Sequence, residues 1–274
     1  MNKLIILLFS IGFSLNLLAQ ENEGSKVEAH ASFDQPEKAK DWAFSVTPYA
    51  LLAAQSTDVG GEKIRQSFSD LSSMTNAGFQ VIMGLRYKRL TASWDGTFAT
   101  LGVEEMQGPL AVDVEIIQRI HDFKLSYMVY DNFEISDNNV LDGWSLEISA
   151  GGKYWKNDVD VSYSLIINDN PILEDGFVEL QEWWDLMIGL KTRFVISPKF
   201  LLGVSYNAGG FGIGESSKFA HDFTYINSFK VHRHLLVNAG FRGFRYRRVD
   251  GEGEEELETT VSVLGPMLGV SVAF

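Results

Sequence analysis

The last nineteen residues, 256–274, constrain the fold more than any other stretch of the chain. Counted back from the terminal Phe274, every second residue is apolar, and the residues between are small or mildly polar. Side chains alternate across a strand, so this pattern predicts one long strand with a bulky face and a slim face. Lipid outside and a narrow lumen inside select such a strand, and we expect a transmembrane β-barrel. The bulky face comprises Val272, Val270, Leu268, Pro266 and Leu264, and the slim face Ala273, Ser271, Gly269, Met267 and Gly265.

The amino terminus has the composition of a secretory signal. A lysine near the start is followed by an apolar run and by Ala19-Gln20 before polar Glu21. We interpret 1–19 as a signal peptide, 20–40 as a flexible periplasmic segment and 41–274 as the barrel. A membrane anchor is the alternative for the first segment, although the run is short for a spanning helix.

Composition narrows the class of protein further. The 274 residues contain no cysteine, so neither disulfides nor a thiolate metal site contribute to stability. A net charge of −13 argues against nucleic acid as a partner. No uncharged apolar run reaches helix-spanning length, which excludes an inner-membrane helical bundle, and 25 glycines fit closed β structure.

Alternation continues through the chain and predicts an all-β, antiparallel, up-and-down barrel of about ten strands, with eight to twelve as the range. The clearest outer face belongs to 184–196, where Trp184, Leu186, Ile188 and Leu190 alternate with polar residues. We read 57–76 as a loop with a helical turn at 68–71. The segment 158–181 is read as a long acidic connection, with an extension of the hairpin beyond the membrane over 159–167 as the alternative for that part. The expected strands are 41–50, 79–88, 90–98, one within 112–130, 144–154, 184–196, 202–208, 221–231, 235–247 and 256–274.

The connections sort into two kinds. Those near 88, 199 and 233 are short and basic, whereas the connections after the odd-numbered strands include the longest and most acidic. Short turns belong on the periplasmic side of such barrels, so both termini should be periplasmic. The segment 131–143 breaks this rule, because it is long and acidic.

Polar residues on the inner faces are the candidate functional residues. They could line a path for solutes, or pair across the lumen and plug it, since a ten-stranded lumen is only slightly wider than one that side chains fill. The set comprises Arg86, Asp95, Lys124, Glu147, Lys153, Asp185, Lys191, Arg193, Asn207 and Arg242.

Several short motifs resemble a family of largely uncharacterised bacterial outer-membrane β-barrels. They are Gly151-Gly152-Lys153-Tyr154-Trp155, Trp184-Asp185, the run 207–214, Gly240-Phe241-Arg242 and the run 264–269. The resemblance extends over nearly all of 41–274. It implies an outer-membrane location and brings no catalytic residues. Lys153 stands where the family motif has arginine and Asn207 where it has aspartate, so a salt bridge between these positions would become a hydrogen bond here.

Other motifs have a simpler interpretation than a functional site. The glycine-rich run 209–214 lacks the strand-to-helix context of a phosphate loop and favours a bulge or close approach at the rim. His232 and His234 share a face without a third ligand, so they make a poor metal site. No cofactor or metal is expected.

The leading hypothesis is therefore a non-enzymatic outer-membrane protein, either structural or a narrow passage for small solutes. The expected partners are outer-membrane lipid, lipopolysaccharide and the barrel-assembly machinery. The alternative is a rim-active protease or lipid-modifying enzyme, or a binding module that uses surface loops. The sequence contains no Gly-x-Ser-x-Gly elbow and no His-Glu-x-x-His motif to support an enzyme.

Overall fold

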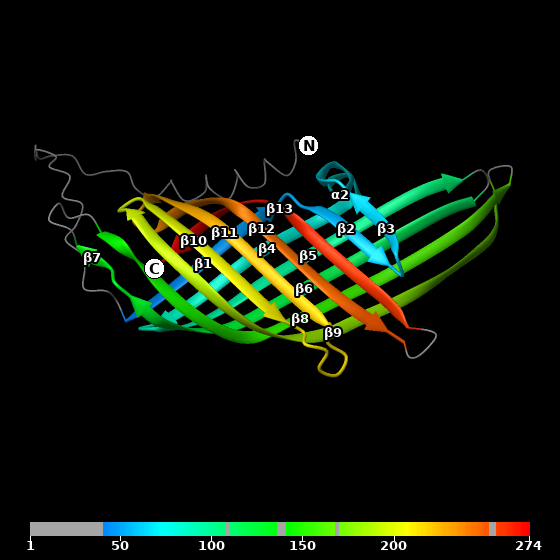
Figure 1. Ribbon diagram of the computed structural model, residues 1–274. Coiled ribbons are helices and arrows are strands. Elements are labelled where there is room, and N and C mark those ends of the chain that lie inside the picture. The colour runs from blue at the N-terminus through cyan, green and yellow to red at the C-terminus, as the bar shows by residue number, and fades with distance from the viewer. Residues whose placement is uncertain (1–40, 108–109, 136–140, 168–169, 252–255) are drawn as a thin grey trace, which may run out of the picture. The chain divides into compact units, whose positions relative to one another are not determined.

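The computed structural model describes residues 41–107, 110–135, 141–167, 170–251 and 256–274 (Figure 1). The expected signal peptide and periplasmic segment, 1–40, lie outside these residues. No helix among the described residues is long and apolar enough to span a membrane.

Ten strands form a closed antiparallel barrel, which confirms the predicted fold class. Around the barrel the order is β1, β4, β5, β6, β8, β9, β10, β11, β12 and β13, and β13 pairs again with β1. The strands are β1 (Trp42–Leu51), β4 (Thr75–Tyr87), β5 (Leu90–Gln107), β6 (Leu110–Asp131), β8 (Leu141–Ile167), β9 (Asn170–Ser197), β10 (Phe200–Gly209), β11 (Phe219–His232), β12 (Leu235–Asp250) and β13 (Leu257–Ala273).

The carboxyl-terminal strand closes the barrel as its alternation predicted. Val46 of β1 lies opposite Val272, and the backbones of Phe44 and Phe274 exchange two hydrogen bonds. Leu268 and Val270 are exposed on the outside, whereas Met267 is buried inside. Both termini of the barrel therefore lie at the same end.

The segment predicted as a loop, 57–76, is instead mostly ordered structure. β2 (Ala54–Val59) pairs with β13 and with β3 (Glu62–Gln66), and α2 (Phe68–Met74) follows. The predicted helical turn is confirmed. Ser67 caps α2 through a capping box with Asp70, and the hydrogen bonds from the Ser67 backbone and side chain lower the pKa of that carboxyl group. The alternation missed β2 and β3 because both strands are short and polar.

The segment 158–181 is not a connection, because these residues continue β8 and β9. The predicted extension of the hairpin over 159–167 is confirmed. The two strands pair from Gly143 and Val195 to Ile167 and Asn170. With β5 and β6 they extend well past the other strands (Figure 1). This four-stranded extension is called the projecting sheet below.

The irregular segment 131–143 contains β7 (Glu134–Ile135), which pairs with the start of β8. The strand count was therefore correct, and the length of this connection reflects a small hairpin at the end that carries the termini. The tight turns at 88–89, 198–199 and 233–234 lie at that same end.

Two bands of aromatic side chains mark the limits of the apolar exterior. Tyr154 and Trp144 are ten residues apart on β8, as are Trp184 and Phe194 on β9. At about 3.3 Å per residue and a tilt near 40°, ten residues rise about 25 Å, the height of the apolar band of outer-membrane barrels. One band contains Trp94, Phe98, Phe123, Tyr154 and Trp184, and the other Trp42, Tyr87, Tyr130, Trp144 and Phe194.

Candidate functional site

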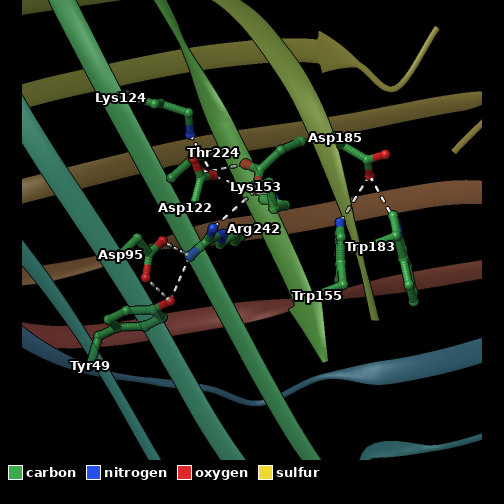
Figure 2. A network of polar contacts seen from close by, with 11 residues as sticks. Tyr49, Asp95, Asp122, Lys124, Lys153, Trp155, Trp183, Asp185, Thr224 and Arg242 are labelled. Atoms are coloured by element: carbon green, nitrogen blue, oxygen red, sulfur yellow. Dashed lines mark hydrogen bonds and ion pairs between the residues drawn. The ribbon is translucent and has the colours of Figure 1, made fainter. Parts of the chain in front are cut away.

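A network of charged side chains lies in the lumen (Figure 2). It is level with the aromatic band that contains Trp94, Tyr154 and Trp184, because Asp95, Lys153 and Asp185 directly follow or precede these residues. Its centre is Arg242 on β12. One guanidinium nitrogen donates to the Tyr49 hydroxyl and to Asp95, each at 2.6 Å, and the other donates to Asp222 at 3.0 Å. The Tyr49 hydroxyl in turn donates to Asp95. Because β12 and β5 are separated by three strands, this arginine connects distant parts of the wall.

Lys153 extends the network toward β6 and β11. Its ammonium group lies 2.9 Å from Asp222 and 3.5 Å from Asp122, and Lys124 lies 2.7 Å from Asp122. Asp122, Asp222 and Lys153 are each 2% exposed. Charges so far from water are tolerated only when they are paired, and here each has at least one partner of opposite sign.

Strand register explains why these residues meet. Asp95 lies opposite Asp122, Asp122 opposite Lys153, and Lys153 opposite Asp185 on the successive strands β5, β6, β8 and β9. The four therefore form one row along the wall, into which Arg242 and Asp222 reach from β12 and β11. We call seven residues the lumen network: Tyr49, Asp95, Asp122, Lys124, Lys153, Asp222 and Arg242. Asp185 lies beside the network at the end of the row.

Asp185 is fully buried and is satisfied by neutral donors. The indole nitrogens of Trp155 and Trp183 donate to it at 2.9 and 3.3 Å, and Ser217 donates through both its backbone amide and its hydroxyl. Ser217 comes from the β10–β11 connection, so this connection folds back onto the barrel mouth.

The glycine-rich run 209–214 allows the β10–β11 connection to fold back in this way. Gly210, Phe211, Gly212 and Gly214 have positive φ, and a Cβ at Gly210 would meet the Ser217 carbonyl oxygen at 2.4 Å. The prediction of close approach at the rim is thus correct, although the segment is a folded connection rather than a bulge.

A hydrophobic cluster lies next to the network and fills the lumen further. Trp155 stacks on Trp183 at 5.6 Å, and Tyr246 contacts both rings. The cavity between the cluster and the network has a volume of about 10 Å³ and is lined by Asp122 and Arg242 among others. Such a space holds about one water molecule. The cluster comprises Ile120, Trp155, Trp183, Met187, Ala220, Tyr246, Val261 and Val263.

A second ionic group lies nearer the termini. Glu147, which is 2% exposed, accepts a hydrogen bond from Arg193 and lies 3.8 Å from Lys191. Lys191 faces Glu147 across the β8–β9 pair, which explains this contact. A buried carboxylate with two basic neighbours adds a further obstacle to solutes in the lumen.

The structure places nine of the ten predicted residues in buried or paired positions. Asp95, Lys124, Lys153 and Arg242 join the lumen network, Asp185 ends its row, and Glu147, Lys191 and Arg193 form the second group. Asn207 is buried with its amide against Gly189, and Arg86 is half-buried near the end of β4 on the side of the termini. The expected contact between Lys153 and Asn207 does not form, because the Lys153 ammonium group pairs with the carboxylates of Asp222 and Asp122 instead.

Sequence reasoning missed three of the seven network residues: Tyr49, Asp122 and Asp222. Asp122 lies one step before the alternation we recognised from Phe123, and Asp222 lies in β11, where alternation is poor. Extending the alternation that starts at Phe123 back by one residue would have identified Asp122. Asp222 has no comparable signal, because its role depends on strands β8 and β12.

His232 and His234 lie at the end of the barrel that carries the termini. Their ring centroids are 6.3 Å apart, and His234 stacks on Phe274. The part of the chain that the structure describes contains no group of three or more residues placed to hold a metal ion.

Comparison with solved structures agrees with this architecture. The outer membrane protease OmpT from Escherichia coli matches 85% of this chain and 97% of its own, with a TM-score of 0.52 and 9% identity. The fold is that of an outer-membrane β-barrel. Together with the apolar exterior and its two aromatic bands, it places this protein in the bacterial outer membrane.

Two further similar structures are smaller or more distant in shape. The Yersinia pestis attachment invasion locus protein Ail matches at 12% identity with a TM-score of 0.38, covering 86% of this chain and all of its own. The translocator domain of autotransporter NalP from Neisseria meningitidis matches at 10% identity with a TM-score of 0.36, covering 87% and 90%. No family model matches the sequence, and no curated protein matches it significantly.

Proposed function

We propose that this protein is a non-enzymatic outer-membrane barrel with a closed lumen, and that it serves as a rigid base for the projecting sheet. The observation that carries the proposal is the reach of Arg242, which binds Asp95 and Asp222 on separate strands in the middle of the lumen. A solute that passed this level would have to separate ion pairs that are nearly inaccessible to water, which is costly in a low-dielectric site.

The same pairing argues against catalysis within the lumen. A general acid or base needs access to a substrate, whereas the carboxylates of the lumen network already accept hydrogen bonds from Arg242, Lys153 or Tyr49. A protease such as OmpT shares the fold, but one fold supports many functions, and the likeness alone carries no activity.

The expected partners follow from the surface. The apolar band suits the acyl chains of the outer membrane, and the aromatic side chains suit its interfaces. Contact with lipopolysaccharide and insertion by the barrel-assembly machinery remain predictions that rest on this class of fold.

Electrical recording in planar bilayers tests the closed lumen. Purified protein, shown to be folded by its heat-modifiable migration on gels, should give no single-channel steps, while a porin in the same bilayers gives them. Stable steps from this protein would overturn the proposal. Hydrolysis of an unstructured peptide or of a lipid by the same preparation would overturn its non-enzymatic part.

A further inference from the structure

The projecting sheet has one long edge to which no described strand is paired. The last pairing of β10 with β9 joins Gly209 to Met187, and the Gly210 amide then donates to the Leu186 carbonyl. Beyond this point β9 continues to Asn170, paired with β8 on its other side. Since Leu186 points its backbone toward β10, alternation directs the backbone groups of Trp184, Glu182, Leu180 and Val178 to the same open edge.

The central part of the open edge, 175–185, lacks the lysine and proline that often protect edge strands against strand addition. Residues 175–185 of β9 contain no lysine, arginine or proline, and Val178 and Leu180 are 73% and 53% exposed. Every charged residue in the stretch is acidic: Asp175, Glu179, Glu182 and Asp185.

A cleft lies at the foot of this edge, between β9 and the folded β10–β11 connection. Its volume is about 420 Å³, and its walls are Tyr154, Trp183, Trp184, Ile213, Glu182 and Glu215. The Tyr154 hydroxyl donates to Glu182 at 2.8 Å, which holds that carboxylate against the aromatic wall. Aromatic faces beside carboxylates attract an organic cation through both cation–π and ionic contacts.

We propose that this edge and cleft together bind an extended basic peptide. The peptide backbone adds as a strand along Val178 to Trp184, and one lysine or arginine side chain enters the cleft between the rings and the two carboxylates. Main-chain pairing supplies affinity and the pocket supplies specificity, as in other complexes formed by strand addition.

The acidic charge of the edge favours a basic peptide over a second copy of the chain. Pairing two copies edge to edge would bring the carboxylates of Glu179 and Glu182 toward the same groups of the partner, which is unfavourable. A cationic lipid headgroup could satisfy the cleft, but it would leave the backbone groups of the open edge unused.

The test uses the full chain in detergent micelles and synthetic peptides of about ten residues that alternate valine and threonine. One peptide has a central arginine, a second has glutamate in its place, and a third has the arginine but carries N-methyl groups on alternate backbone nitrogens. Binding is followed by tryptophan fluorescence. The arginine peptide should bind, and each of the other two should bind roughly tenfold or more weakly.

Matched variants locate the cation. Replacing both cleft carboxylates, Glu182→Gln with Glu215→Gln, should weaken the arginine peptide by roughly tenfold or more. Glu179→Gln removes the same charge from the same strand but on its other face, and should have little effect.

Equal affinity for the arginine and glutamate peptides, equal loss in both variants, or no binding at all would overturn the proposal. Undiminished binding of the N-methylated peptide, or of phosphatidylethanolamine vesicles in its place, would assign the cleft to a free cation or headgroup and also overturn it.

Discussion

On β6 and β8, the membrane-spanning part of the barrel and the projecting sheet have opposite polarity. Along β6, the spanning part has Phe123 and Leu125 exposed outside and Asp122 buried inside. In the projecting part the acidic Asp113 and Glu115 are on the outer face, and Val114 and Ile116 are half-buried on the inner face. The apolar residues have moved from odd to even positions of one strand.

On β8 the apolar residues also switch faces beyond the aromatic band. Ile148 is exposed outside and Lys153 is buried inside, whereas beyond the aromatic band Asp160 is outside and Val161 inside. The strand keeps its period of two throughout, and only the phase of the pattern changes. On these two strands the surroundings of the wall therefore set which face is apolar: lipid selects an apolar exterior, and water selects an acidic one. β9 does not reverse, because Val178 and Leu180 remain exposed on its outer face.

The largest effect is expected when a buried charge is removed from the interior of the membrane-spanning part. Asp222→Ala deprives Lys153 and Arg242 of a shared buried partner. Leaving buried cations underpaired should lower the free energy of unfolding by about 3–5 kcal/mol, measured by urea titration in lipid vesicles.

The matched control is an exposed ion pair between β12 and β13, at the end of the barrel away from the termini. Arg247 and Glu258 lie 3.9 Å apart, and both side chains are about half exposed. Glu258→Ala should cost about 0–1 kcal/mol, because water screens such pairs. If the two variants lost similar stability, the lumen network would not be desolvated and the closed lumen would be doubtful.

The next prediction places one substitution on each side of the aromatic band. Leu190 and Val178 both point outward from β9 and are 56% and 73% exposed. Leu190→Arg puts a cation into acyl chains and should cost about 2–4 kcal/mol. Val178→Arg puts it into water and should cost almost nothing.

Folding yield into lipid vesicles, read from heat-modifiable migration, separates the two variants. Equal yields would mean that the band does not end between Leu190 and Val178. A loss in Val178→Arg alone would reverse the direction in which we place the membrane.

The change of phase also explains which parts of the fold were predictable. Ten strands, their faces in the membrane and nine buried or paired lumen residues followed from alternation alone, because lipid enforces one phase over each spanning segment. The acidic stretch 158–181 was read as a connection, since Val159 and Val161 alternate in the phase opposite to Leu146 and Ile148. When the apolar residues of one strand switch from one face to the other, the sequence pattern looks the same as that of a strand that ends there.

Other features depend on contacts between distant residues and had no local signal. Asp185 resembles a lumen charge that needs a cation, yet its partners are two indoles and Ser217, which a folded glycine-rich connection brings back from 32 residues along the chain. The partners of Lys153 likewise follow from strand register and from the width of the lumen. Neither can be read from spacing.

The smallest predicted effect sharpens the comparison within the projecting sheet itself. Val161 lies on the inner face opposite Val114 and Phe177, and its neighbour Ser162 is exposed on the outer face. Val161→Asn removes a half-buried apolar side chain and should cost about 1 kcal/mol, roughly half the value of full burial. Ser162→Asn makes a comparable change in water and should be close to neutral. Hydrogen exchange of the β8 and β9 amides beyond the band should therefore quicken about fivefold in the first variant and hardly change in the second. If Ser162→Asn proved the more damaging, the apolar face of the projecting sheet would be the outer one, and the reversal of polarity along β8 would be wrong.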